Sequence, residues 1–289
     1  MNDPQSDAAA KPAPAKKPVK EGTDWWAEAK GIFWLILAVL GFHSFIAKPF
    51  YIPSESMMPT LLTGDRLVVT KFPYGWSYIS PSFHMIPFIH GRLLGRLPER
   101  GDIVIVTPLH QSADYIKRVI GLPGDTIAMR NGTVILNGKP VKREFKPPIM
   151  IPVDANVPCD EDKLPGRRMT GADGRIYCAL PLVRETLPNG VSFNTLDLGE
   201  YPTDEMEPLV IPPDHVFLMG DNRDQSADSR VSAAANGLDG PVPYENIGGR
   251  AEFITFSLDG TSDIWNPISW FTALRGSRAG TSLRPDKAQ

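Results

Sequence analysis

Cysteine is scarce in this chain: only two of its 289 residues are cysteines, Cys159 and Cys178, and they form no CxxC pair. A structural zinc site is therefore not expected. The five histidines have no metal-ligand spacing, and the sequence contains no HExxH, GxSxG or Walker A motif. The sequence therefore predicts neither a metal nor an organic cofactor.

Strong charge and helical periodicity are also missing. The formal net charge is −3, which gives no whole-chain attraction to nucleic acid. No helical period of useful length appears after Ala47, and 29 prolines disfavour long helices. Most of the chain is therefore expected to consist of short strands and turns.

The N-terminal region contains the one long apolar run. Residues 1 to about 22 are rich in Ala, Pro and Lys, so residues 1–30 are predicted to form a disordered tail. Residues 31–47 read GIFWLILAVLGFHSFIA, carry no formal charge and predict a transmembrane helix. A buried core helix and a cleaved signal peptide are the alternatives. A cleaved peptide would lie nearer the N-terminus and end in a small-x-small site, whereas this run exits through Lys48, Pro49 and Phe50.

Basic residues flank the apolar run unevenly. Five lysines precede it, whereas Lys48 and then Arg66 follow it. The positive-inside rule predicts a single-pass protein with a cytoplasmic N-terminus and with everything after Ala47 outside. Ser56 lies nine positions beyond Ala47, so it lies at most about 30 Å from the end of the span.

Short β-branched or aromatic runs follow at 66–72, 102–107, 115–120, 133–138, 214–219 and 251–258. The sequence thus predicts a mostly β fold. An antiparallel β-sheet domain at 48–139 and 213–275 carries a smaller inserted β/loop subdomain at 140–212 and a flexible tail at 276–289. The insertion contains both cysteines, so a Cys159–Cys178 disulfide is expected in an oxidising compartment.

Two segments contain the residue types of a nucleophile and its base. The first, PSESMMPT at 53–60, is on its own typical of a turn. In the second, YIKRVIG, period-two alternation places Tyr115, Lys117 and Val119 on one face. Burial there would lower the pKa of Lys117 and supply a neutral amine that can accept a serine proton. The alternative is an edge-strand lysine whose amine reaches solvent.

A third segment, GDNRDQSADSR at 220–230, is dense in Asp, Arg and Ser. These side chains are suited to a charge-assisted network that fixes a loop beside a site. A polar surface turn is the alternative. His215, with an aspartate and Ser56, would form a Ser–His–Asp set, but nothing in the local sequence supports it.

PSESMMPTL, YIKRVIGLPGD and GDNRDQSADSR occur in this order behind the apolar run. This combination resembles the type I, or leader, signal peptidases, from about Phe50 to Phe256. The resemblance implies a mostly β catalytic core with a smaller β insertion. Some relatives have two N-terminal spans, whereas this chain shows one.

The resemblance implies roles by position. Ser56 matches the nucleophile and Lys117 the general base of a Ser–Lys dyad. The Ser54 hydroxyl and the Ser56 N–H match the oxyanion hole. The positions that would line the substrate pockets are Phe50, Ile52, Met57, Leu61, Tyr115 and Ile116.

Three further residues match supporting positions of the family. Ser226 matches the hydroxyl that orients the lysine amine, and Asp228 and Arg230 match the pair that holds this loop. Near the C-terminus, three aromatic residues would either touch the membrane or pack beside the site: Trp265, Trp270 and Phe271.

The implied activity is that of a monomeric serine endopeptidase of the bacterial inner membrane with a periplasmic catalytic domain. It would remove signal peptides from exported preproteins after small, Ala-x-Ala-like residues. Its partners would be these signal peptides and the lipid bilayer, with no nucleic acid, metal or cofactor. The alternatives are a non-catalytic, membrane-tethered β module that binds exported proteins and a self-cleaving Ser–Lys regulator. The latter lacks support because no DNA-binding helical domain is present.

Overall fold

The computed structural model describes residues 24–80, 91–111 and 113–287. Two compact units, Met1–Val39 and Leu40–Gln289, are considered separately. The predicted disordered tail lies largely outside the described residues. Its last part is corrected: residues 25–30 are helical, because Asp24 accepts hydrogen bonds from the backbone of Trp26 and Ala27 and starts the helix at Trp25.

Helix α1 spans Trp25–Phe45 and so begins six residues before the predicted span at 31–47. Its 21 residues give a length of about 30 Å, which matches the hydrocarbon core of a bilayer. Most of its large apolar side chains are exposed, so it is not a buried core helix. It is the one helix in the described part of the chain that is long and apolar enough to cross a membrane.

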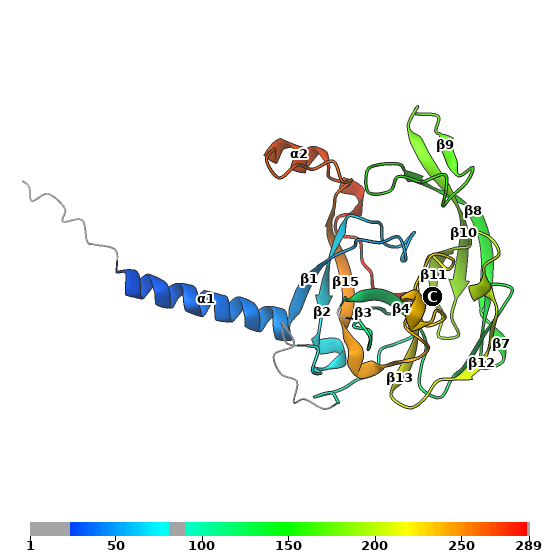
Figure 1. Cartoon of the computed structure of the whole chain (residues 1–289), viewed down its shortest axis with the longest axis horizontal. Helices are drawn as coiled ribbons and strands as arrows, with labels where there is room; N and C mark the ends of the chain where they lie inside the picture. The colour runs from blue at the N-terminus through cyan, green and yellow to red at the C-terminus, as the bar shows by residue number, and fades with distance from the viewer. Residues whose placement is uncertain (1–23, 81–90, 112, 288–289) are drawn as a thin grey trace, which may run out of the picture. The chain divides into compact units, whose positions relative to one another are not determined.

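The unit from Leu40 onward is built mostly of antiparallel sheets, with one short helix, α2 (Pro267–Thr272), which confirms the predicted fold class (Figure 1). A seven-stranded sheet has the order β1-β2-β15-β3-β4-β13-β14. Its strands are β1 (Ala47–Tyr51), β2 (Asp65–Thr70), β15 (Ile247–Ser257), β3 (Ile103–Val106), β4 (Tyr115–Gly121), β13 (His215–Met219) and β14 (Val242–Pro243).

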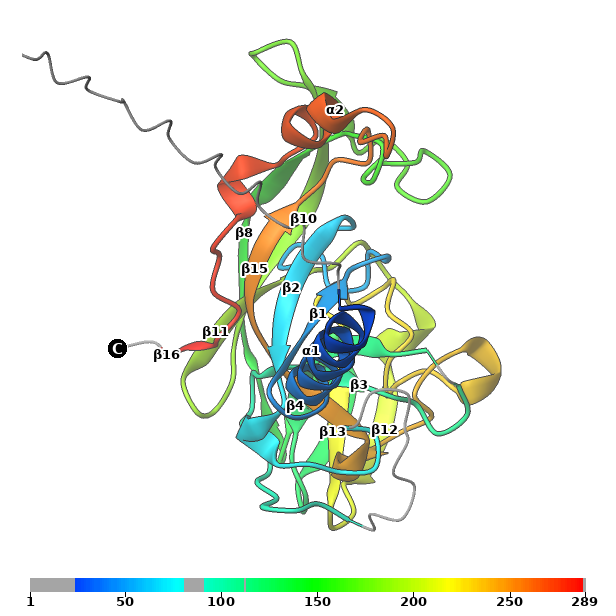
Figure 2. The same cartoon turned by 90° about the vertical axis from the view of Figure 1, so that its left-hand side faces the viewer.

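Two smaller sheets complete this unit. One has the order β16-β11-β10-β8 (Figure 2), with β9 also paired to β10, and the other has the order β12-β5-β6-β7. Their strands are β16 (Asp286–Lys287), β11 (Val191–Leu196), β10 (Ile176–Thr186), β8 (Lys142–Pro152), β9 (Arg168–Thr170), β12 (Met206–Val210), β5 (Thr126–Arg130), β6 (Thr133–Leu136) and β7 (Lys139–Pro140). Each of the six predicted β runs overlaps one observed strand.

The segment 140–212 supplies strands β8 to β11 of one sheet, but it is not separate from the rest of the unit. Strand β12 returns to pair with β5, and β16 from the far C-terminus pairs with β11. One buried apolar cluster also joins Phe193 of β11 to Phe217 of β13. The segment is therefore tied into the rest of the unit by shared strands and a shared core.

Cys159 and Cys178 are joined in a disulfide. Both half-cystines are buried in an apolar cluster with Met58 and Leu62, which follow Ser56 closely in the sequence. The disulfide therefore fastens the 160–177 loop to the core that supports the Ser56 segment.

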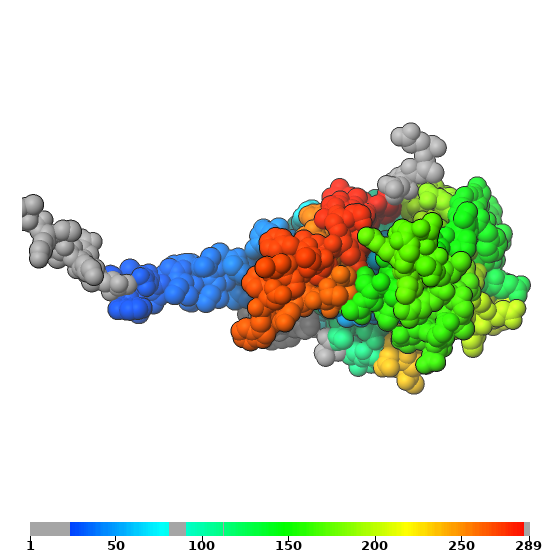
Figure 3. Space-filling model, turned by 90° about the horizontal axis from the view of Figure 1, so that it is seen from above, coloured from blue at the N-terminus to red at the C-terminus, as the bar shows by residue number. Residues whose placement is uncertain are grey.

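The expected flexible tail from residue 276 is corrected. Residues Gly276–Arg278 form a 3-10 turn, and Leu283 is buried. Arg278 Nε donates to Asp65 at 2.8 Å, and Arg275 makes a two-point contact with Asp154. Figure 3 shows the orange-red surface of the C-terminal part beside the green surface of the middle of the chain. Part-buried ion pairs and the packing of Leu283 hold this segment. The composition of the segment does not reveal partners that lie far away in the sequence.

Candidate active site

Ser56 lies in a tight turn directly after the first strand. The chain leaves β1, and the turn is closed by Met58 N–H donating to the Glu55 carbonyl at 3.0 Å. The turn sends the side chain of Met57 into the core, where it is fully buried. Ser56 itself is only 8% exposed, so it is largely shielded from solvent.

Lys117 meets Ser56 from the large sheet. Strand β4 lies between β3 and β13, so Lys117 is not on an edge strand and its side chain is only 3% exposed. Its Nζ lies 3.0 Å from Ser56 Oγ and 5.3 Å from the centroid of the Tyr115 ring, as the predicted shared face requires. Burial lowers the pKa of Lys117 to about 8, although Asp228 and Asp221 oppose this shift.

A lowered lysine pKa does not by itself identify a base in this chain. Burial also lowers the pKa of Lys71 to about 8. The Lys71 amine donates to the backbone carbonyl of Ser80 instead of a hydroxyl. The contact with Ser56 Oγ is thus what distinguishes Lys117.

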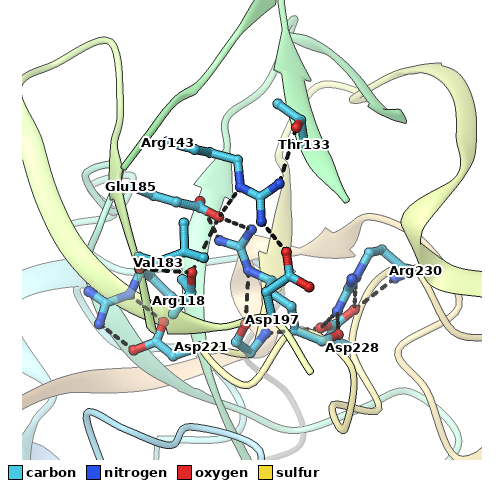
Figure 4. A network of polar contacts seen from close by, with 12 residues as sticks. Arg118, Thr133, Arg143, Val183, Glu185, Asp197, Asp221, Asp228 and Arg230 are labelled. Carbon is cyan, nitrogen blue, oxygen red and sulfur yellow. Dashed lines mark hydrogen bonds and ion pairs between the residues drawn. The ribbon is translucent and has the colours of Figure 1, made fainter. Parts of the chain in front are cut away.

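Three buried ion pairs hold the loop at 220–230 (Figure 4). Arg230 pairs with Asp228 at 2.8 Å, and both side chains are inaccessible. The predicted network is therefore present, and the loop is not a solvated turn. Asp228 also accepts from the backbone N–H of Gly220 at 2.9 Å, which closes the loop on itself.

The two other ion pairs join this loop to two sheets. Asp221 makes a two-point contact with Arg118 of β4, with both distances 2.7 Å. Arg223 makes a two-point contact with Glu185 of β10, at 2.6 and 2.7 Å. The sequence analysis missed both pairs. A usable signal was present, because an arginine in an apolar strand such as that of Arg118 needs a buried acid as partner.

The two supporting serines differ in their contacts. Ser54 Oγ lies 3.4 Å from Ser56 Oγ, so it is beside the hydroxyl as expected. The Ser226 hydroxyl is buried and has no hydrogen-bond partner among the described residues, Lys117 included. It packs against Gly220, whose backbone also lies close to the Ser56 carbonyl.

A pocket of about 580 Å³ opens beside Ser56 and Lys117. Four of the predicted substrate-binding residues line it: Phe50, Ile52, Tyr115 and Ile116. Met57 and Leu61 do not, because the turn after Ser56 buries both of them completely in the core. The pocket wall also includes Ile105, Lys163 and Gln225, which the motifs did not indicate.

Other candidates lie away from this pocket. His215 Nδ1 lies 2.7 Å from the Pro213 carbonyl, and no contact joins it to Ser56 in the described part. Trp265 and Phe271 are mostly exposed and do not line the pocket. Among the described residues, no group of three or more His, Cys, Asp or Glu could hold a metal ion.

Comparison with known proteins identifies the family of this chain. The family described as "Signal peptidase, peptidase S26" matches residues 25–256. A signal peptidase I from Rickettsia typhi is 36% identical over 267 residues, covering 86% of this chain and 90% of the relative. One from Rickettsia bellii is 34% identical over 241 residues, covering 80% and 73%. A solved signal peptidase I from Enterococcus faecalis is 22% identical, covers 54% of this chain and 97% of its own, and has a TM-score of 0.28.

The fold, the site and these similarities define a serine peptidase with an N-terminal membrane-anchoring helix. The chain belongs to the signal peptidase I family, the S26 peptidases that remove signal peptides. This membership removes support from the alternative of a non-catalytic binding module.

The lowered pKa of Lys117 predicts the pH dependence of the enzyme. If Lys117 is the base, only its neutral amine accepts a proton, so kcat/KM should rise with pH and level off above about 8. The measurement is a pH–rate profile of peptide cleavage. A profile whose acid limb appears only above about pH 10, near the value of a solvated lysine, would contradict a buried amine as base.

The close packing at Gly220 predicts a second effect. A Cβ at this position would lie 2.2 Å from Ser226 Oγ and 2.4 Å from the Ser56 carbonyl oxygen. Gly220→Ala should therefore displace Ser56 and lower kcat/KM by about a hundredfold. Gly276→Ala is the control, because a Cβ there meets nothing within 4 Å. Equal activity of the two variants would show that the turn tolerates the displacement.

Proposed function

We propose that this chain cleaves signal peptides by a Ser–Lys dyad, with Ser56 as nucleophile and Lys117 as general base. The 3.0 Å contact between Lys117 Nζ and Ser56 Oγ is the observation that supports this most directly. The neutral amine removes the hydroxyl proton as Ser56 Oγ attacks the scissile carbonyl. The protonated amine then gives its proton to the leaving amine, and an acyl-enzyme remains.

The acyl-enzyme is hydrolysed by the same two groups. Lys117, neutral again, accepts a proton from a water that attacks the acyl carbonyl, and Ser56 Oγ regains a proton as it leaves. In both steps the carbonyl oxygen gains negative charge. The backbone N–H of Ser56 and the hydroxyl of Ser54, 3.4 Å from Ser56 Oγ, would donate to it.

The proposed specificity is for small residues before the cut. The pocket beside Ser56 is lined by apolar side chains that include Ile52, Ile105 and Ile116. A wall of branched apolar side chains would favour a small apolar residue such as alanine. We therefore expect cleavage after Ala-x-Ala-like sequences in exported preproteins.

The proposed location is the outer face of a bacterial inner membrane. The excess of lysines before α1 supports a cytoplasmic N-terminus. The Cys159–Cys178 disulfide supports an oxidising compartment for the catalytic unit. Ser54, Ser56 and Lys117 come from one chain, so the proposed dyad needs no residue from a second copy of the protein.

Substitution of the dyad tests the proposed mechanism. Ser56→Ala and Lys117→Ala should each abolish cleavage of a preprotein with an Ala-x-Ala site, because one lacks the nucleophile and the other its base. Lys71→Met is the matched control, since it removes the other buried lysine with a lowered pKa. The assay uses the full-length enzyme and follows cleavage by the change in gel mobility of the preprotein. Continued cleavage by the Ser56 and Lys117 variants would disprove the dyad.

The disulfide allows a test of orientation in cells. If the catalytic unit faces outward, Cys159 and Cys178 should resist alkylation after denaturation until a reductant is added. The measurement is a mass shift with a thiol-reactive reagent on the full-length protein. Free thiols in freshly quenched cells would place the unit on the cytoplasmic side.

A further inference from the structure

One buried residue holds the peptide groups on both sides of Ser56. Asn222 Nδ2 donates to the Glu55 carbonyl at 3.2 Å. The backbone N–H of the same Asn222 donates to the Ser56 carbonyl at 3.1 Å. The loop at 220–230 is therefore hydrogen-bonded to two consecutive carbonyls of the segment that contains Ser56.

The held Glu55 carbonyl fixes the direction of the Ser56 N–H. The Glu55–Ser56 peptide bond is not among the cis bonds of the described chain, so its carbonyl and N–H point in opposite directions. Within the described residues nothing accepts a hydrogen bond from the Ser56 N–H. Anchoring the carbonyl on one side thus presents an unpaired donor on the other side.

The surroundings of Asn222 suit a residue that holds the Glu55 carbonyl without contacting the substrate. It is 2% exposed and does not line the pocket, so it does not touch the substrate. Its Oδ1 is buried and accepts no hydrogen bond within the described part, so the amide acts as a donor there. Its second donor contact, to Gln225 Oε1 at 3.3 Å, fixes the plane of the amide.

We propose that Asn222 is a positioning residue that orients the Ser56 N–H toward the oxyanion through its hydrogen bond to the Glu55 carbonyl. The inference rests on the proposed function, since it requires Ser56 to be the nucleophile. It adds a residue from the 220–230 loop to the control of the oxyanion hole. This loop would then act on both halves of the reaction, on the base through its charges and on the oxyanion through Asn222.

The experiment compares three variants of the full-length enzyme. Asn222→Ala and Asn222→Leu both remove the donor, and leucine retains most of the side-chain volume. Asn246→Ala is the matched control: Asn246 is 1% exposed and its Nδ2 donates to the Thr107 carbonyl at 2.9 Å, outside the pocket. The readouts are kcat, KM, the pH–rate profile and the affinity for a peptide boronate that forms a tetrahedral adduct with serine.

Both Asn222 variants should lower kcat by at least about tenfold with KM within about twofold, since an oxyanion donor acts mainly in the transition state. Boronate affinity should fall by a similar factor, and the acid limb should stay where it is in the wild type. The Asn246→Ala enzyme, assayed as folded protein, should keep its kcat and its boronate affinity.

Three outcomes would overturn the proposal. They are an unchanged kcat in both Asn222 variants, full activity of Asn222→Leu alone, which would indicate packing, and a shifted acid limb, which would indicate an effect on Lys117. Failure of the dyad itself is recognised separately, because the Ser56→Ala enzyme would then still cleave. An active Asn222→Ala enzyme beside an inactive Ser56→Ala enzyme rejects only the role of Asn222.

Discussion

The site depends on one desolvated amine in contact with one hydroxyl. In water, the amine of Lys117 would be protonated at neutral pH and could not accept a proton from Ser56. Burial in the middle of a sheet penalises the charged form and lowers the pKa to about 8, which is within reach of ordinary conditions. The strand order matters for this reason, because an edge position would have left the amine in solvent.

Nearby charges limit how far burial lowers the pKa of Lys117. Asp228 and Asp221 lie close enough to favour the protonated amine. Each aspartate is bound to its own arginine, Arg230 and Arg118, and these ion pairs offset much of the negative charge. Breaking a buried pair leaves an uncompensated charge, which typically costs about 3–5 kcal/mol. The same ion pairs therefore hold the loop in place and reduce the negative electrostatic potential at the Lys117 amine.

Several parts of the structure were predictable because their signals are local. β-branched and aromatic runs bounded by Gly, Pro and Asp indicated the strands, and all six predicted runs overlap an observed strand. Alternation along Tyr115–Val119 placed Lys117 beside the Tyr115 ring. The long strands β8 and β10 were not foreseen, because Pro147, Pro148 and many charges obscure their pattern. Met57 and Leu61 were assigned to the pocket, yet a single turn directs them into the core.

The sequence by itself determined the anchor helix, the β character of the remainder and the residue types of the proposed nucleophile and base. These properties follow from periodicity and from short motifs, which act over a few residues. Only the tertiary structure decided that Ser56 and Lys117, 61 positions apart, meet at 3.0 Å. It also decided which acid pairs with Arg118 and which amide holds the Glu55 carbonyl. Such contacts arise from the packing of strands distant in sequence, so no local pattern encodes them.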